Sequence, residues 1–144
     1  MANLSTSGLD ELIGGLEKIA EIPDATILEM LTAEAEVVVA EQKAALSTAY
    51  HGKYTKGITA RSVKYSKKLK KSKDGKAIYV YPQGTRTDGN KRRVAEVAFI
   101  NEYGTKKRGI PRRLTIRTAN AKAEQAAAEA ATEVYEKFLK SKNL

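Results

Sequence analysis

The chain has 144 residues, of which 42% are hydrophobic, so it has enough apolar side chains for one domain with a modest core. It contains no cysteine, which excludes disulfides and thiolate metal sites. No run approaches the roughly 18 apolar residues of a membrane span, and the first twelve residues lack the basic and apolar parts of a signal peptide. These features are compatible with a reducing cytoplasm.

The formal net charge of +9 is unevenly distributed along the chain. Residues 1–49 carry nine acids and two bases, and residues 50–113 carry nineteen bases and four acids. Residues 114–144 are nearly balanced, with five bases and four acids. Such separation favours stacking against copies or partners, or contact with a polyanion.

The first 48 residues predict two helices. Residues 8–20 have apolar residues at helical spacing, but Gly14 and Gly15 weaken the centre, so residues 1–22 are expected to hold only a marginal helix. A second helix is predicted from Pro23 to about Thr48, with the proline tolerated in the first turn. Its apolar stripe comprises Ile27, Leu28, Leu31, Ala35, Val38, Val39, Gln42 and Leu46.

The middle of the chain predicts a β-hairpin. After a predicted loop over 49–61, residues 62–70 alternate between apolar and polar, which is typical of a strand with one wet face. Residues 71–75 contain the Asp-Gly turn signature, and residues 76–82 form the return strand. A two-stranded hairpin is marginal alone. Either a third strand near 106–113 or another subunit must complete the sheet.

The last third predicts a short helix and a long one. Residues 83–91 and 105–110 are expected to be mobile loops, and residues 92–103 a short helix that Gly104 ends. From about 114 to 140 the alanine-rich pattern is helical, with an inner face of Ile116, Ala119, Ala123, Ala126, Ala127, Ala130, Val134, Phe138 and Leu139. The fold class is therefore α+β: residues 1–144 form a single domain with two long helices packed on a small antiparallel sheet that contains the hairpin.

Catalytic chemistry finds little support in the sequence. His51 is the only histidine, and the acidic residues of 29–41 have the spacing of a solvated helix face. Neither Gly52–Lys53 nor Gly104–Thr105 has the strand–loop–helix context of a phosphate-binding loop. We predict no enzyme activity, no cofactor, no metal and no small-molecule substrate.

Basic residues are the candidate partner-contact side chains. Lysine clusters beside Tyr65, Tyr79 and Tyr81 suit a nucleic-acid backbone, whereas lysines on a strand edge also prevent unwanted pairing. A small DNA-binding protein, or a toxin or inhibitor of an acidic partner, are therefore alternative functions. The candidate contacts are Lys67, Lys68, Lys70, Lys71, Lys73, Arg92, Arg93, Lys106, Lys107, Arg108 and Arg112.

One stretch resembles a family of tailed-phage minor tail components, the tail-completion, neck or head–tail joining proteins of siphophage type. The family pattern is an apolar helix ending in acidic-aromatic-Gly-Thr, then a variable loop, a proline-arginine segment and a final helix. Here Glu102, Tyr103, Gly104 and Thr105 match the first part, and Pro111 and Arg113 match part of the second. Residues 55–59 with 62–63 are also similar to the family's segment before the hairpin. Leu114 and Thr115 replace its usual second proline and aromatic residue.

The resemblance implies a structural role in the virion. Family members are expected to form rings, commonly hexameric, at the head-proximal end of the tail, although the free protein can be a monomer. The implied partners are copies of the chain, the tail tube protein and the head-connector protein, with DNA passing through the lumen and no membrane. The implied location is the head–tail interface of a phage or prophage-derived particle made in the bacterial cytoplasm.

Overall fold

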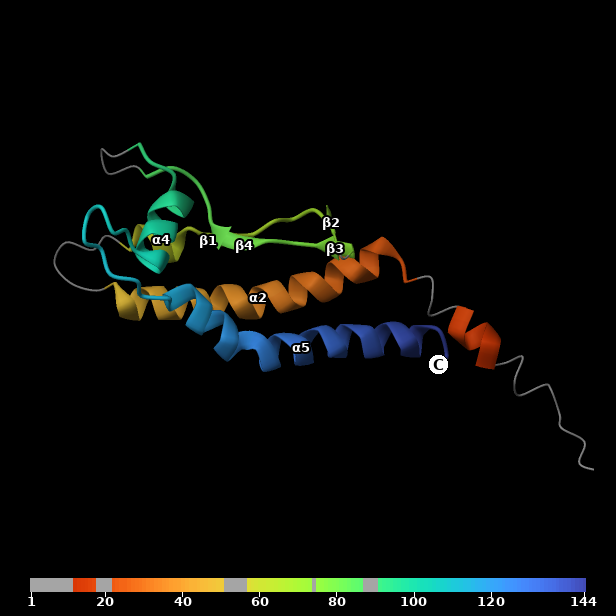
Figure 1. Cartoon of the computed structure of the whole chain (residues 1–144). Helices are drawn as coiled ribbons and strands as arrows, with labels where there is room; N and C mark the ends of the chain where they lie inside the picture. The colour runs from red at the N-terminus through yellow and green to blue at the C-terminus, as the bar shows by residue number, and fades with distance from the viewer. Residues whose placement is uncertain (1–11, 18–21, 51–56, 74, 87–90) are drawn as a thin grey trace, which may run out of the picture.

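The structure is a computed structural model that describes residues 12–17, 22–50, 57–73, 75–86 and 91–144. Its two long helices, α2 (Asp24–Ala49) and α5 (Thr115–Ser141), run side by side in opposite directions. The strands and the short helix α4 (Val94–Tyr103) lie along the other side of α2, so α2 is the middle layer (Figure 1). The predicted α+β fold class is confirmed.

The two long helices pack through small side chains. In α5 the buried residues recur every fourth position, which places them in one row along the helix: Ala119, Ala123, Ala127 and Ala131. They pack where α2 buries Ala35 and Gln42. Because methyl side chains occupy little space, the two backbones can approach closely. The prediction for Ala126 is wrong, because the buried row passes through Ala131 and leaves Ala126 exposed.

The remaining core lies at the C-terminal end of α2. Leu46 and Val63 are fully enclosed together with Ala60 of a helical turn, α3 (Ile58–Arg61). Val39, Val80 and Ile116 pack against them from α2, the hairpin and the start of α5. This cluster joins every layer at one end of the molecule, and α3 corrects the prediction that 49–61 is entirely loop.

The hairpin is a long ribbon with two separate pairings. Strand β1 (Val63–Tyr65) pairs antiparallel with β4 (Val80–Pro82), and β2 (Lys70–Ser72) pairs with β3 (Gly75–Ala77). The continuous strand predicted over 62–70 is therefore wrong. The Ser66 hydroxyl oxygen accepts the Tyr79 amide at 3.0 Å, which replaces a ladder bond at the interruption. Ser72 pairs directly with Gly75, so the turn is shorter than the predicted 71–75.

Several other boundaries bear on the predictions. Residues 12–17 are helical, and the rest of the predicted helix 8–20 lies outside the described residues. Pro23 is the residue before α2 rather than part of its first turn, since its ψ of 147° is extended. Near 106–113 the described chain forms only an isolated bridge, Thr105–Ile110, so it supplies no third strand. Among the described residues, no helix is both long and apolar enough to cross a bilayer.

Candidate functional site

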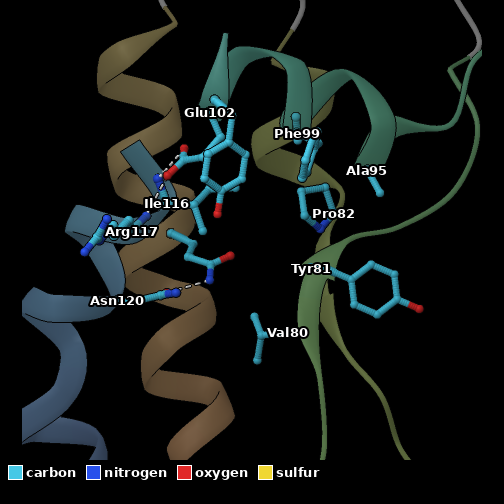
Figure 2. Close-up of a pocket in the computed structure, with 12 residues that line it drawn as sticks. Val80, Tyr81, Pro82, Ala95, Phe99, Glu102, Ile116, Arg117 and Asn120 are labelled. Carbon is cyan, nitrogen blue, oxygen red and sulfur yellow. Dashed lines mark hydrogen bonds between the residues drawn. The ribbon is translucent and has the colours of Figure 1, made fainter. Parts of the chain in front are cut away.

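The Glu-Tyr-Gly-Thr stretch forms a rigid joint between α4 and α5. Glu102 is only 4% exposed, yet no Lys or Arg of the described residues forms an ion pair with its carboxylate. Its two oxygens accept the backbone amides of Ile116 at 2.9 Å and Arg117 at 2.8 Å, in the first turn of α5 (Figure 2). These amides have no partner within the helix, and the positive end of the helix dipole favours an anion. Glu102 is therefore the side-chain cap of α5, although it lies 14 residues upstream.

Gly104 lets the chain turn sharply after α4. The predicted helix end is confirmed: its φ is 69°, and its amide donates to the Ile100 carbonyl at 2.8 Å. A Cβ at this position would lie 2.4 Å from the Ile110 carbonyl oxygen and 2.9 Å from the Arg112 nitrogen, both backbone atoms. No side chain fits there, so the motif needs glycine for space as well as for conformation.

The loop after Gly104 is a closed turn. Thr105 and Ile110 exchange both backbone hydrogen bonds, at 3.0 and 3.1 Å, and the Gly109 amide donates to the Lys106 carbonyl. The predicted contact residues Lys106, Lys107 and Arg108 are exposed at its tip. Backbone bonds therefore fix the base of the loop whatever side chains the tip carries.

The chain then returns to the same glutamate. The Glu102 carbonyl oxygen accepts the amides of Arg113 and Leu114, each at 3.1 Å. Leu114 has a φ of 52°, which is unusual for a residue with a side chain. It occupies the position where the resembled family has a second proline. The Arg113 guanidinium lies over the Tyr50 ring at 5.1 Å, which ties the segment to the end of α2.

An aromatic surface lies beside this joint. Phe99 and Tyr103 occupy successive turns of α4, their ring centroids are 4.8 Å apart, and they are 64% and 52% exposed. Next to them is a cavity of about 330 Å³ between α4, β4 and the first turns of α5. Figure 2 shows Phe99 and Val80 on the side facing Ile116 and Asn120. We call this cavity with its two aromatic residues the α4 groove.

The wall of the α4 groove contains an incompletely bonded amide. Gln42 is 1% exposed and donates from Nε2 to Asn120 Oδ1 at 2.7 Å. Its other atom, Oε1, is buried without a hydrogen-bond partner. A buried unpaired acceptor is costly, so this amide lowers the stability of the groove wall.

The basic candidate residues are all exposed, but they form two surfaces. Arg92, Lys107 and Arg108 line one hollow near the joint, where Arg93 and Arg112 are also exposed. The lysines at 67, 68, 70, 71 and 73 lie on the ribbon, whose tip extends toward the start of α2. There Lys76 pairs with Asp24. The ribbon's lysines therefore lie apart from the 105–110 loop, because the ribbon runs away from it (Figure 1).

Three features of this site were not selected from the sequence. Glu102 was assigned to a motif without its role as a cap, while Phe99 and Gln42 were not candidates. The spacing of Phe99 also fits the alternation of a strand, so the sequence did not indicate that its ring is exposed. The one usable signal was its i, i+4 spacing to Tyr103, which places the two rings on the same face of a helix. His51 lies outside the described residues, within which no three His, Asp or Glu side chains gather to hold a metal.

Comparison of the chain with protein-family models, with curated proteins and with solved structures finds no match. The function is therefore argued from the site itself and from the sequence resemblance.

Proposed function

We propose that the protein is a structural phage virion protein that forms a ring at the head-proximal end of the tail and joins the tail tube to the head connector. The observation that carries the proposal is the exposed aromatic pair Phe99 and Tyr103 beside an open groove, on the joint that the family-like motif builds. The sequence resemblance suggests a phage tail as the particle, and the exposed aromatic surface gives a physical reason for the chain to assemble with other subunits.

The α4 groove has the composition of a protein-interaction surface. Phe and Tyr are enriched at the centres of interfaces, where they bury a large area with few rotatable bonds. Here the two rings are held on one helix, whose neighbouring turn buries Ala98 and Glu102 in the body of the molecule. A rigid aromatic surface loses little entropy when a partner covers it.

The two ends of the molecule differ in a way that suits a ring. The joint end carries the exposed bases of 92–113 and the aromatic pair, whereas the opposite end carries the exposed apolar side chains of 12–17 and the tip of the lysine-bearing ribbon (Figure 1). Contacts between unlike surfaces are heterologous, and they close into a ring when the rotation between copies permits. Within the described residues, no third strand pairs with either edge of the β1–β4 pairing. A strand of another subunit can therefore add to it.

The test is assembly on phage tails. Purified protein is mixed with isolated tail tubes and connectors, and the complexes are examined by electron microscopy and sedimentation. We expect a ring at the head-proximal end of the tube, and a Phe99→Ser, Tyr103→Ser variant that binds poorly. The matched control is Tyr79→Ser, which removes an exposed tyrosine of the ribbon outside the groove. If no association occurs at any salt concentration, the proposal is refuted.

DNA binding is the second candidate, and the ribbon favours it. Five lysines are exposed there, and Lys70 lies over the Tyr79 ring at 5.5 Å, so cations and an aromatic face share one surface. Direct binding predicts an affinity that falls with salt, with a log–log slope of about −0.9 for each phosphate contacted. A flat salt response in a titration with duplex DNA would remove this alternative.

A further inference from the structure

We infer that the α4 groove receives the N-terminal helical segment, residues 12–17, of a neighbouring copy of the chain. This inference rests on the proposed ring and specifies its subunit contact. The segment and the groove both leave apolar side chains of the described chain without cover, and they lie at opposite ends of the α2–α5 pair (Figure 1).

The segment presents apolar side chains to solvent. Leu12, Ile13 and Leu16 are exposed, Leu12 by 59% and Leu16 by 56%. The spacing of 12 and 16 is one helical turn, so the two leucines lie on the same face. Gly15 is buried instead, and a Cβ there would be 3.1 Å from the Leu144 side chain at the end of the chain. The segment therefore packs through Gly15 against Leu144 at the C-terminus of the same chain, while Leu12 and Leu16 face outward.

The groove offers a matching surface. Its volume of about 330 Å³ is at the lower end of the roughly 300–1,000 Å³ range of binding pockets and is sufficient for aliphatic side chains rather than a whole helix. Val80, Ala98 and Ile116 contribute to its apolar lining, and Phe99 and Tyr103 provide the exposed rim. Leucines inserted here would cover both aromatic rings.

Charge complementarity selects a copy of the chain as the occupant. Residues 10–21 contain four acids and one base, and residues 92–117 contain eight bases and two acids. Opposite net charges steer the two surfaces together and disfavour contact between two like ends. A partner with a basic apolar helix would be repelled by the bases of 92–117.

The arrangement gives each copy one donor segment and one acceptor groove. The segment lies beside the C-terminus of α5, while the groove lies at the first turns of α5. Those ends of a 27-residue helix are about 40 Å apart at 1.5 Å per residue. Docking between copies is therefore head to tail, which extends from subunit to subunit until a ring closes.

The absence of cysteine from the chain allows a direct test by cross-linking. A Leu16→Cys chain and a Tyr103→Cys chain are mixed under oxidising conditions, and disulfide-linked pairs are measured on gels. The control replaces Tyr103→Cys with Lys71→Cys on the ribbon, which is also exposed. We expect at least tenfold more heterodimer from the first mixture. Equal yields from the two mixtures would overturn the inference.

Complementation of two defective chains tests the head-to-tail polarity. A Leu16→Glu variant lacks a functional segment but keeps its groove, and a Phe99→Glu variant keeps its segment but lacks a functional groove. Each alone should associate at least tenfold more weakly than the unaltered chain in sedimentation, with an unchanged circular dichroism spectrum because both side chains are exposed. Mixed together, they should form a one-to-one dimer that grows no further.

The outcomes separate this contact from the ring itself. If the Leu16→Glu and Phe99→Glu variants still assemble on tail tubes, and the two cysteine chains form no specific cross-link, the ring stands and this contact is refuted. If a Leu16→Cys, Tyr103→Cys double variant cross-links within one monomer, the segment folds back on its own groove and the inference also fails. If the unaltered chain never associates with tail tubes while the cross-link forms, the contact stands and the phage role is lost.

Discussion

Replacing Glu102 with alanine is the sharpest test of the joint. The carboxylate is buried and accepts two amides of α5, at 2.9 and 2.8 Å. Each hydrogen bond to a charged group contributes about 1.5–3 kcal/mol. Half of this is regained when water reaches the freed amides, because Arg117 is exposed and Ile116 only half-buried. Two such bonds total about 3–6 kcal/mol, so we expect Glu102→Ala to lower the free energy of unfolding by roughly 1.5–3 kcal/mol.

Thermal and urea unfolding followed by circular dichroism measure this loss. For a chain of this size, 1 kcal/mol corresponds to about 3–4 °C in Tm, so a loss near 2 kcal/mol corresponds to roughly 6–8 °C. The loss from Glu102→Gln should be smaller than that from Glu102→Ala, since the glutamine oxygen can keep one of the two hydrogen bonds. Its NH2 group cannot accept the other, because it is itself a donor.

Glu133→Ala is the matched control. Glu133 is exposed in the middle of α5, where alanine is a better helix former, so the expected change is within about 0.5 kcal/mol. The capping argument is refuted if Glu102→Ala destabilises the protein no more than this control does.

Three further predictions concern space, charge and the loop. Gly104→Ala should destabilise the fold by more than about 2 kcal/mol, because its Cβ meets backbone atoms, whereas Gly109→Ala has open space and should cost only about 1 kcal/mol for its positive φ. Burial raises the pKa of the half-buried Glu34 carboxyl above its usual 4.5. The folded state therefore favours the protonated form, so Glu34→Gln should raise stability at pH 7, and its advantage should disappear as pH falls below the ordinary pKa. Replacing Lys106, Lys107 and Arg108 with serine should leave Tm nearly unchanged and weaken binding to the tail or connector.

Each of these has a contrary result. Equal losses from the two glycine variants, measured by urea unfolding, would mean that crowding at Gly104 is unimportant. A gain from Glu34→Gln that persists in acid, or that the exposed Glu36→Gln matches at pH 7, would remove the desolvation argument. A lower Tm for the triple serine variant would mean that the loop tip, and not only its backbone bonds, holds the turn.

Periodicity and composition were sufficient for the long elements. The stripe from Ile27 to Leu46 predicts α2, and the alanine-rich run after Thr115 predicts α5, because local propensity and apolar spacing agree in both. Gly104 was also a reliable end for α4, since few residues besides glycine adopt its φ. The order of the elements followed from these signals.

The same signals were insufficient where tertiary contacts compete with local pattern. Alternation over 62–70 predicted one strand, but the Ser66 hydroxyl replaces a ladder bond and divides the ribbon. Ala126 and Ala131 fit a helical face equally well, and only the crossing of α5 over α2 selects Ala131 for burial. Such choices depend on the direction from which a neighbouring helix arrives.

The sequence by itself determined the helices, the hairpin and the separation of acidic from basic segments, because these depend on neighbours within one or two turns. Only the tertiary structure decided that Glu102 caps a helix 14 residues away, that the ribbon carries its lysines away from the joint, and that Phe99 is left exposed beside an open groove. Those facts depend on which distant segments meet, and burial at one position follows from packing that no local spacing encodes.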